Sequence, residues 1–88
     1  MTPVEARIAS TILGLLDARA PGSTICPSEA ARALSDDEAT WRALMPEVRR
    51  VAAALAAEDR LRVTARGKDV DALTAPGPIR LGRPLNRD

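Results

Sequence analysis

Hydrophobic residues recur at helical spacing near the start of the chain. Thr2 is a good N-cap, Pro3 suits the first helical position, and Glu5 completes a capping box. The apolar residues that follow share one face of this helix and are predicted to be buried: Val4, Ile8, Ile12, Leu15 and Leu16. The helix should end before Pro21, because a residue that precedes proline avoids helical angles.

A short β-branched segment and a second helix come next. Residues 23–25 suit a short strand. Pro27 then opens a helix, with Cys26 or its neighbour at the cap and Glu29 in the first turn, where negative charge suits the helix dipole. Alanines within residues 30–34 make this helix narrow enough to lie close to a neighbour.

The third helical pattern runs through a proline. Ser35 and Glu38 have the spacing of a capping box, which predicts the start of the helix. The apolar stripe then keeps its phase on both sides of the proline, at Trp41, Leu44, Val48, Val51 and Leu55. Pro46 falls opposite this stripe, so the carbonyl of Arg42 that it frees can meet water. We favour one kinked helix over about residues 37–58. The alternative is a turn that ends near Leu44 and a new helix with Pro46 at its first position.

After residue 59 the hydrophobic period changes from that of a helix to that of a strand. Residues 66–68 suit a turn, residues 69–71 a short returning strand, and residues 74–78 a loop. We expect the apolar residues of the hairpin to face the helices: Leu61, Val63, Ile79 and Leu81. The predicted fold is mainly α with a small antiparallel β-hairpin, a winged helix-turn-helix with the order α-β-α-α-β-β. Residues 1–83 form its single domain, and residues 84–88 form a frayed tail.

The composition supports one small domain and a cytoplasmic location. A chain of 88 residues buries about two-thirds of its surface on folding, so its core is thin. The hydrophobic fraction is 45%, much of it alanine, and Trp41 is the only aromatic residue. No apolar run is long enough for a membrane span, and the N-terminus shows no export signal. The single cysteine cannot form an internal disulfide, which fits a reducing compartment.

The residue types argue against catalysis. The chain has no histidine, no tyrosine and one cysteine, which excludes ordinary catalytic triads and the usual zinc sites, and its five glycines are scattered. We therefore expect no enzymatic activity, no cofactor and no metal. Cys26 is interpreted as a capping or half-buried residue, and Asp69 and Asp71 as turn caps. The acidic residues 36–38 are interpreted as compensation of a helix dipole.

Four segments resemble a known family: PSEAARAL, WRALMPEVRRVAAAL, LRVTARGKDVD and GPIRL. They are similar to a family of short, uncharacterised bacterial proteins that is regarded as a winged-helix domain of unknown function. The resemblance covers roughly residues 5–83, and its more specific parts are residues 41–50 and the GPIRL segment. It implies a winged-helix fold and carries over no catalytic or binding residue.

Positive charge is concentrated in the second half of the chain. Residues 1–41 hold three basic and six acidic residues (net −3), whereas residues 42–88 hold ten basic and six acidic residues (net +4). In a winged helix the third helix enters the major groove and the hairpin follows the backbone. Arginine suits both tasks. The sequence thus predicts a duplex-DNA-binding module resembling a transcriptional regulator, with Leu13 as a candidate homodimer contact. The candidate contacts with DNA are Arg42, Arg49, Arg50, Arg62, Arg66, Lys68 and Arg80.

A second hypothesis keeps the winged-helix shape without DNA. Residues 36–38 place acids at the start of the third helix, Glu47 lies beside Arg50, and a net charge of +1 is low for a DNA-binding module. A protein partner would then meet the sheet or the alanine-rich residues 52–57. Convergence of the guanidiniums on one face would favour DNA. Pairing with acidic neighbours would favour the protein-interaction module; these neighbours are Glu47, Glu58, Asp59, Asp69 and Asp71.

Overall fold

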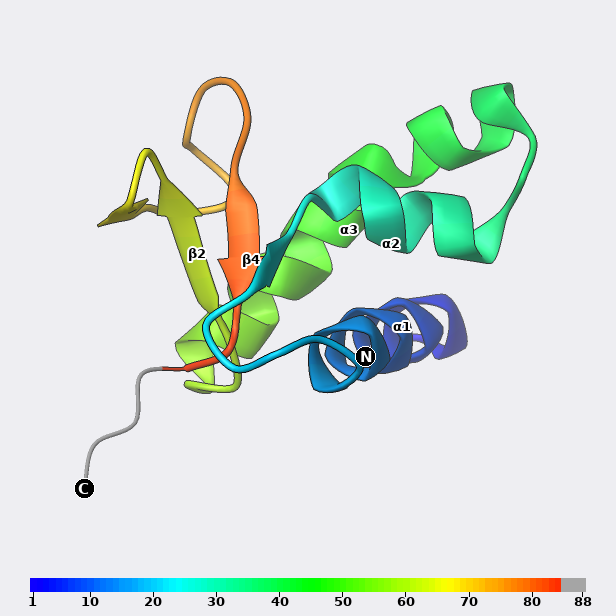
Figure 1. The fold of residues 1–88 in the computed structure, drawn as a ribbon. Coiled ribbons are helices and arrows are strands. Elements are labelled where there is room, and N and C mark those ends of the chain that lie inside the picture. The colour runs from blue at the N-terminus through cyan, green and yellow to red at the C-terminus, as the bar shows by residue number, and fades with distance from the viewer. Residues whose placement is uncertain (85–88) are drawn as a thin grey trace.

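Three helices and a small antiparallel sheet make up the computed structural model, which describes residues 1–84 (Figure 1). In chain order the elements are α1 (Pro3–Asp17), β1 (Thr24–Ile25), α2 (Pro27–Leu34), α3 (Glu38–Ala57), β2 (Arg62–Ala65), β3 (Lys68–Asp69) and β4 (Arg80–Gly82). This confirms the predicted mainly α fold with a small antiparallel sheet, and β3 lies close to the short returning strand expected at residues 69–71. The predicted tail, residues 84–88, lies outside the described residues except for Pro84.

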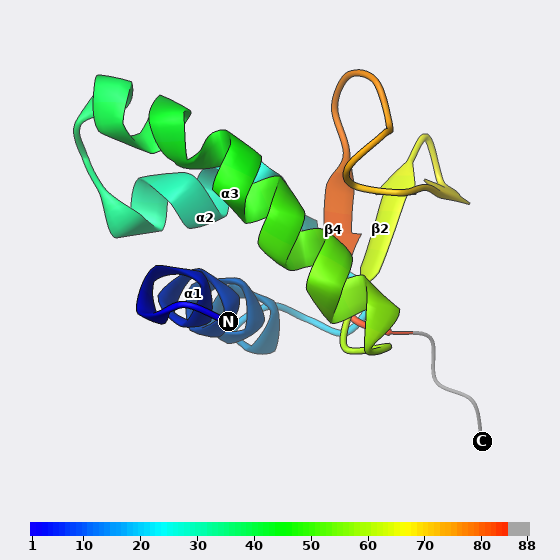
Figure 2. The ribbon, with the colours of Figure 1, turned by 180° about the vertical axis from the view of Figure 1, so that it is seen from behind.

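The last strand in sequence occupies the interior of the sheet. The strand order is β1-β4-β2-β3, and each neighbouring pair is antiparallel. Gly82 pairs with Thr24 on one side and with Arg62 on the other, and Arg80 pairs with Thr64. Figure 1 shows the sheet in front of α3, and Figure 2, seen from behind, shows α3 in front. One face of the sheet is therefore turned toward α3, and we call the other its outer face.

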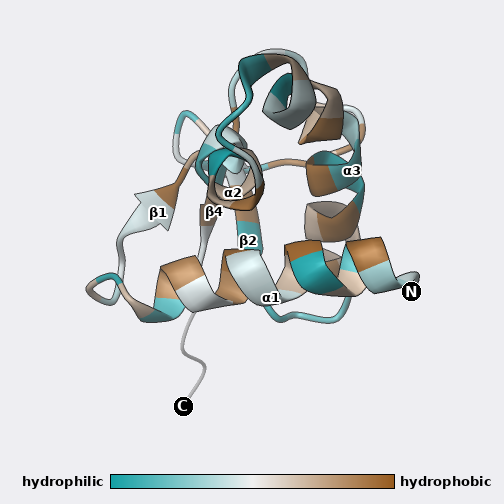
Figure 3. Cartoon of the chain, turned by 90° about the vertical axis from the view of Figure 1, so that its right-hand side faces the viewer, coloured by the Kyte–Doolittle hydropathy of each residue, from teal (hydrophilic) through white to brown (hydrophobic). Residues whose placement is uncertain are grey.

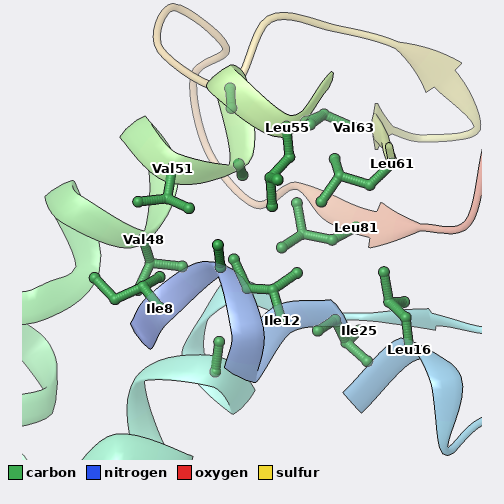
Figure 4. Close-up of a cluster of buried hydrophobic side chains, with 14 of the residues drawn as sticks. Ile8, Ile12, Leu16, Ile25, Val48, Val51, Leu55, Leu61, Val63 and Leu81 are labelled. Carbon is green, nitrogen blue, oxygen red and sulfur yellow. The ribbon is translucent and has the colours of Figure 1, made fainter. Parts of the chain in front are cut away.

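The core lies between α1, α3 and the sheet, and Figure 4 shows how their side chains meet. The hairpin residues that were predicted to face the helices are at most 3% exposed, which confirms that prediction: Leu61, Val63, Ile79 and Leu81. Burial of each such side chain contributes about 1.5–3 kcal/mol. Within residues 1–84, no helix combines the length and apolar character that crossing a membrane requires.

The first turn of α1 lies beyond the core. Thr2 caps the helix as predicted, and its backbone N–H donates to Glu5 Oε1 at 3.0 Å. Val4, however, is 56% exposed, so its predicted burial was wrong. Ile8, one turn further along, is the first core residue of α1, and the helix extends past the packed region by that one turn. Figure 3 shows hydrophobic and hydrophilic residues interspersed along α1.

Helix α3 is continuous through Pro46, which confirms one helix rather than two. Pro46 is exposed, whereas Val48, Val51 and Leu55 on the opposite side are buried. Trp41 is half-buried and packs against the core. The apolar stripe therefore stays on one side of the helix before and after the proline.

The start of α3 differs from the prediction. Asp37, not Ser35, is the N-cap, and its Oδ2 accepts hydrogen bonds from the backbone N–H and the hydroxyl of Thr40 at 2.9 and 2.6 Å. Ser35 Oγ instead accepts from the backbone N–H of Asp37 at 3.2 Å. A carboxylate accepts hydrogen bonds more strongly than a hydroxyl, and it adds a favourable charge at the helix N-terminus.

Candidate nucleic-acid interface

Two of the three predicted arginines on α3 are paired with carboxylates of the same helix. Arg42 Nε lies 2.8 Å from Glu38 Oε2, and its guanidinium carbon lies 4.9 Å from the ring centroid of Trp41. Arg50 forms an ion pair with Glu47, one turn earlier. Exposed pairs of this kind contribute only about 0–1 kcal/mol, but they neutralise the positive charge of the helix surface.

The third arginine, Arg49, holds a loop of the protein in place. Its Nη1 donates to the carbonyl oxygens of Ala72 and Ala75, both at 3.2 Å, and its Nη2 donates to that of Gly77 at 2.6 Å. Because the guanidinium is half-buried and engaged by three carbonyls, it is not a free cation on the helix surface. Through these hydrogen bonds it holds the loop between β3 and β4 against α3. The sequence had suggested a contact with DNA for this residue instead.

Arg62 and Arg80 lie on the outer face of the sheet, as expected for positions that alternate with core residues. Arg62 donates to Asp69 Oδ1 through Nη2 at 2.7 Å and through Nε at 3.2 Å. Arg80 donates to Thr24, through Nε to Oγ1 at 2.9 Å and through Nη2 to the carbonyl oxygen at 3.0 Å. Each arginine thus crosses to a different strand and helps to hold the register.

Arg66 and Lys68 stand at the turn between β2 and β3. Ala65 pairs with Lys68, so Arg66 and Gly67 form a two-residue loop, with φ of 54° and 81°. Positive φ at both positions is typical of a type I′ turn. Arg66 and Lys68 are exposed, and neither side chain forms an ion pair or hydrogen bond within residues 1–84. We call these two residues the hairpin-tip cations.

The seven predicted residues do not converge on one face. Residues 36–57, which contain the whole of α3, hold three basic and four acidic residues. Residues 58–84 hold six basic and four acidic residues. The sheet lies in front of α3 in Figure 1 and behind it in Figure 2, so the outer face of the sheet is turned away from α3. Net positive charge is therefore carried by the strand region and not by α3.

A cation that the sequence analysis missed lies just after β4. Arg83 donates through Nη2 to the carbonyl oxygens of Leu16, Asp17 and Arg19 at 3.0, 3.2 and 3.2 Å. Its Nε donates to Leu16 as well, at 3.3 Å. These carbonyls belong to the end of α1 and the segment that follows it, so nothing close to Arg83 in the sequence indicates the contact.

The end of α1 is also tied to the start of α2. Arg19 Nη2 lies 2.9 Å from Glu29 Oε1, and the backbone N–H of Cys26 donates to Glu29 Oε2 at 2.7 Å. The Cys26 N–H and then Arg19 lower the pKa of Glu29 below its ordinary value. The carboxylate of Glu29 therefore caps α2 and binds the neighbouring segment in its charged form.

The remaining candidate groups have structural roles. Cys26 is the half-buried N-cap of α2, and Ser28 Oγ donates to its sulfur at 3.1 Å. Asp71 Oδ1 accepts from the backbone N–H of Leu73 at 2.8 Å, as expected for a turn cap. No cluster of three or more potential metal ligands occurs in residues 1–84. Leu13, the predicted homodimer contact, is half-buried against the protein's own core.

Comparison with known proteins identifies a family without an assigned activity. A search of the curated proteins finds no match. The family model described as "Protein of unknown function (DUF3253)" matches residues 5–84, which is nearly the whole chain. The chain therefore belongs to the DUF3253 family.

Proposed function

We propose that this protein binds duplex DNA, and that the hairpin-tip cations, Arg66 and Lys68, make the main contact with the phosphate backbone. The observation that carries the proposal is that these two exposed cations flank a glycine at a projecting turn and have no partner within residues 1–84. Unpaired cations need no internal ion pair to be broken before they neutralise phosphates. Phosphate contacts of this kind supply affinity and position without reading sequence.

The backbone of Arg66 supports the same proposal. Its φ of 54° lies in the left-handed region, which an ordinary L-residue adopts at a cost of about 1–2 kcal/mol. Glycine, asparagine or aspartate would fit this first position of a type I′ turn better. A cation therefore stands where turn chemistry favours another residue, and such local strain is typical of functional sites.

Fluorescence anisotropy with a random-sequence duplex at two salt concentrations tests the proposal. We expect binding at low salt that weakens as salt rises, and the two hairpin-tip contacts should contribute about −1.8 to the logarithmic slope. Arg66→Gln with Lys68→Gln should remove most of this binding. The matched control, Arg7→Gln with Arg60→Gln, also removes two exposed basic residues and should bind as the wild type does. Absence of wild-type binding at low salt, or full binding by the tip variant, would overturn the proposal.

A protein-interaction module is the second candidate function. It is supported by the pairing of Arg42, Arg50 and Arg62 with acidic neighbours and by the lack of convergence of the predicted cations on one face. The acidic residues 36–38 at the start of α3 also disfavour a helix that approaches phosphates. Under this proposal the wild type shows no salt-dependent binding to duplex DNA in the same titration. Salt-dependent binding that is lost in the tip variant would count against it.

A further inference from the structure

The outer face of the sheet is hollowed next to the hairpin tip. A cavity of about 590 Å³ lies there, and its lining includes Thr24, Arg62, Thr64, Gly67, Gly82 and Arg83. Arg62, Gly82 and Thr24 are neighbours across three strands, which makes them the floor of the hollow. A Cβ at Gly82 would come within 3.2 Å of Thr24 Cγ2, so this central position has no room to spare for a side chain.

The chemistry of the lining favours an anion. The lining includes two arginines and two threonines and, among the described residues, no carboxylate, although Arg62 is paired with Asp69 outside the lining. Arg62 and Arg83 use Nε and Nη2 for their internal hydrogen bonds. Within residues 1–84, Nη1 of each arginine and Oγ1 of Thr64 make no hydrogen bond, so they remain available as donors. Arginine and hydroxyl donors are well suited to phosphate oxygens.

The second cavity of the strand region is different. It has a volume of about 390 Å³, and its lining includes the same Arg62 together with Asp59 and Asp69. Two carboxylates beside one guanidinium leave that cavity without the positive charge that an anion needs. The hollow on the outer face differs in that its lining includes a second arginine, Arg83, and among the described residues no carboxylate.

We propose that this hollow binds a backbone phosphate of the DNA that the hairpin tip engages. The duplex then lies against the outer face of the sheet, on the side away from α3. Gly67 lines the hollow and stands between Arg66 and Lys68 in the chain, so the hollow and the hairpin tip form one continuous surface. The inference rests on the proposed DNA binding and adds to it the face of the protein that the duplex contacts.

Arg50 provides a matched comparison for Arg62. Each arginine forms an ion pair with an exposed or half-exposed carboxylate; Arg50 lies on α3, and Arg62 lines the hollow. In the anisotropy titration, Arg62→Gln should lower the affinity about tenfold and reduce the salt slope by about 0.9, whereas Arg50→Gln should change neither. Arg62→Gln with Asp69→Asn keeps the net charge and should still lose affinity, because the contact itself is lost.

Thr64→Val gives a readout that does not involve charge. It removes a hydroxyl from the hollow without changing the size of the side chain much, and it should lower the affinity while leaving the salt slope unchanged. The melting temperature of each variant identifies any that fails to fold. Valine is β-branched and suits a strand, so we expect the Thr64→Val variant to fold and to test the inference even if an arginine variant does not.

The outcomes separate this inference from the proposed function. If the Arg62 and Thr64 variants bind as the wild type does while the tip variant loses binding, the hollow is not a phosphate site and the hairpin-tip proposal stands. If Arg50→Gln loses as much affinity as Arg62→Gln, the duplex contacts α3 and the inference is overturned. If the wild type does not bind, both proposals fail.

Discussion

Arg83 Nη2 donates a hydrogen bond of 3.0 Å to the carbonyl oxygen of Leu16, near the C-terminal end of α1. A helix leaves its last carbonyls without partners in the helix, and positive charge there is favourable. Helix α1 has no basic residue in its own last turn. The arginine that follows β4 supplies that charge, and the contact joins segments from opposite ends of the chain.

Replacement of Arg83 by glutamine should lower the free energy of unfolding by about 1.5–3 kcal/mol, since charged hydrogen bonds to partly buried carbonyls are lost. Urea denaturation followed by circular dichroism measures the change. Arg60→Gln removes an arginine whose nearest carboxylate, on Glu58, is 3.7 Å away, and it should cost less than about 0.5 kcal/mol. Equal effects of the two substitutions would contradict a capping role for Arg83.

Arg49→Met should destabilise the protein by about 2 kcal/mol, because the carbonyl oxygens of Ala72, Ala75 and Gly77 lose their donor. Amide hydrogen exchange should become faster in residues 70–79. Arg50→Met, at the adjacent exposed position, should change stability by less than about 0.5 kcal/mol. Unchanged exchange in the Arg49 variant would show that the loop holds its conformation without this arginine.

Arg66→Gly should stabilise the protein by about 0.5–1 kcal/mol, because glycine adopts positive φ without strain. This gain should exceed the cost of the greater conformational freedom of glycine in the unfolded chain. Under the proposed function the same substitution weakens DNA binding. Thermal unfolding and anisotropy on one preparation measure both effects. A destabilised variant would show that the Arg66 side chain makes a contact that outweighs the strain.

Asp59→Gly is the matched control for that substitution. Asp59 also has positive φ, 58°, just after α3, where its N–H donates to Ala56 and the N–H of Arg60 donates to Leu55. These bonds form a Schellman cap, at which glycine is the usual residue. The substitution should stabilise the protein slightly and leave DNA binding unaffected. Reduced binding would mean that relief of backbone strain alone alters the interface.

Pro46→Ala should raise the free energy of unfolding by about 1–2 kcal/mol. Alanine has a backbone N–H that can donate to the carbonyl of Arg42, and its helix propensity is far higher than that of proline. The greater freedom of the unfolded alanine variant offsets only part of this gain. Pro46 is exposed, so the substitution leaves no cavity in the core. Chemical denaturation provides the test. A loss of stability would mean that Pro46 itself is needed to hold Trp41 and Leu44 against the core.

Stability should fall in acid because three carboxylates cap helix N-termini. Hydrogen bonds from the backbone N–H of Thr2, from that of Cys26, and from the side chain of Thr40 lower the pKa of Glu5, Glu29 and Asp37 from ordinary values of 4.5, 4.5 and 3.8. A lowered pKa in the folded state contributes stability above the ordinary value, and this stability is lost as the pH falls through the folded-state pKa.

The urea midpoint should therefore be steady near neutral pH and decrease progressively below about pH 5. Glu29→Gln should lower the midpoint at neutral pH and make its acid-induced decrease shallower. A midpoint that rises between pH 5 and pH 3 would contradict this account of the caps.

Several features follow from the sequence because they depend on local pattern. The unbroken phase from Trp41 to Leu55 predicts a single α3, since a helix that restarted after Pro46 would usually lose that phase. Arg42 follows Glu38 by four residues, and Arg50 follows Glu47 by three. Helical spacing alone therefore brings the two side chains of each pair together. Local order of this kind requires no knowledge of the tertiary fold.

Other features could not be predicted because they depend on distant segments. The partners of Arg49 are backbone carbonyls of a loop, and only the packed fold places that loop beside α3. Burial of Val4 was predicted from periodicity, which identifies a face but not how far along the helix the core extends. The hollow on the outer face likewise depends on the pairing of Gly82 with both Thr24 and Arg62.

The place of β4 inside the sheet has a consequence for synthesis on the ribosome. Thr24 and Ile25 have no strand partner until Gly82 and Leu81 have been made, so β1 stays unpaired until β4 has been synthesised. The nascent chain can form its helices early, because their contacts are local, but sheet closure comes at the last step and requires a contact of high sequence separation. Completion of the fold therefore requires that synthesis has passed β4.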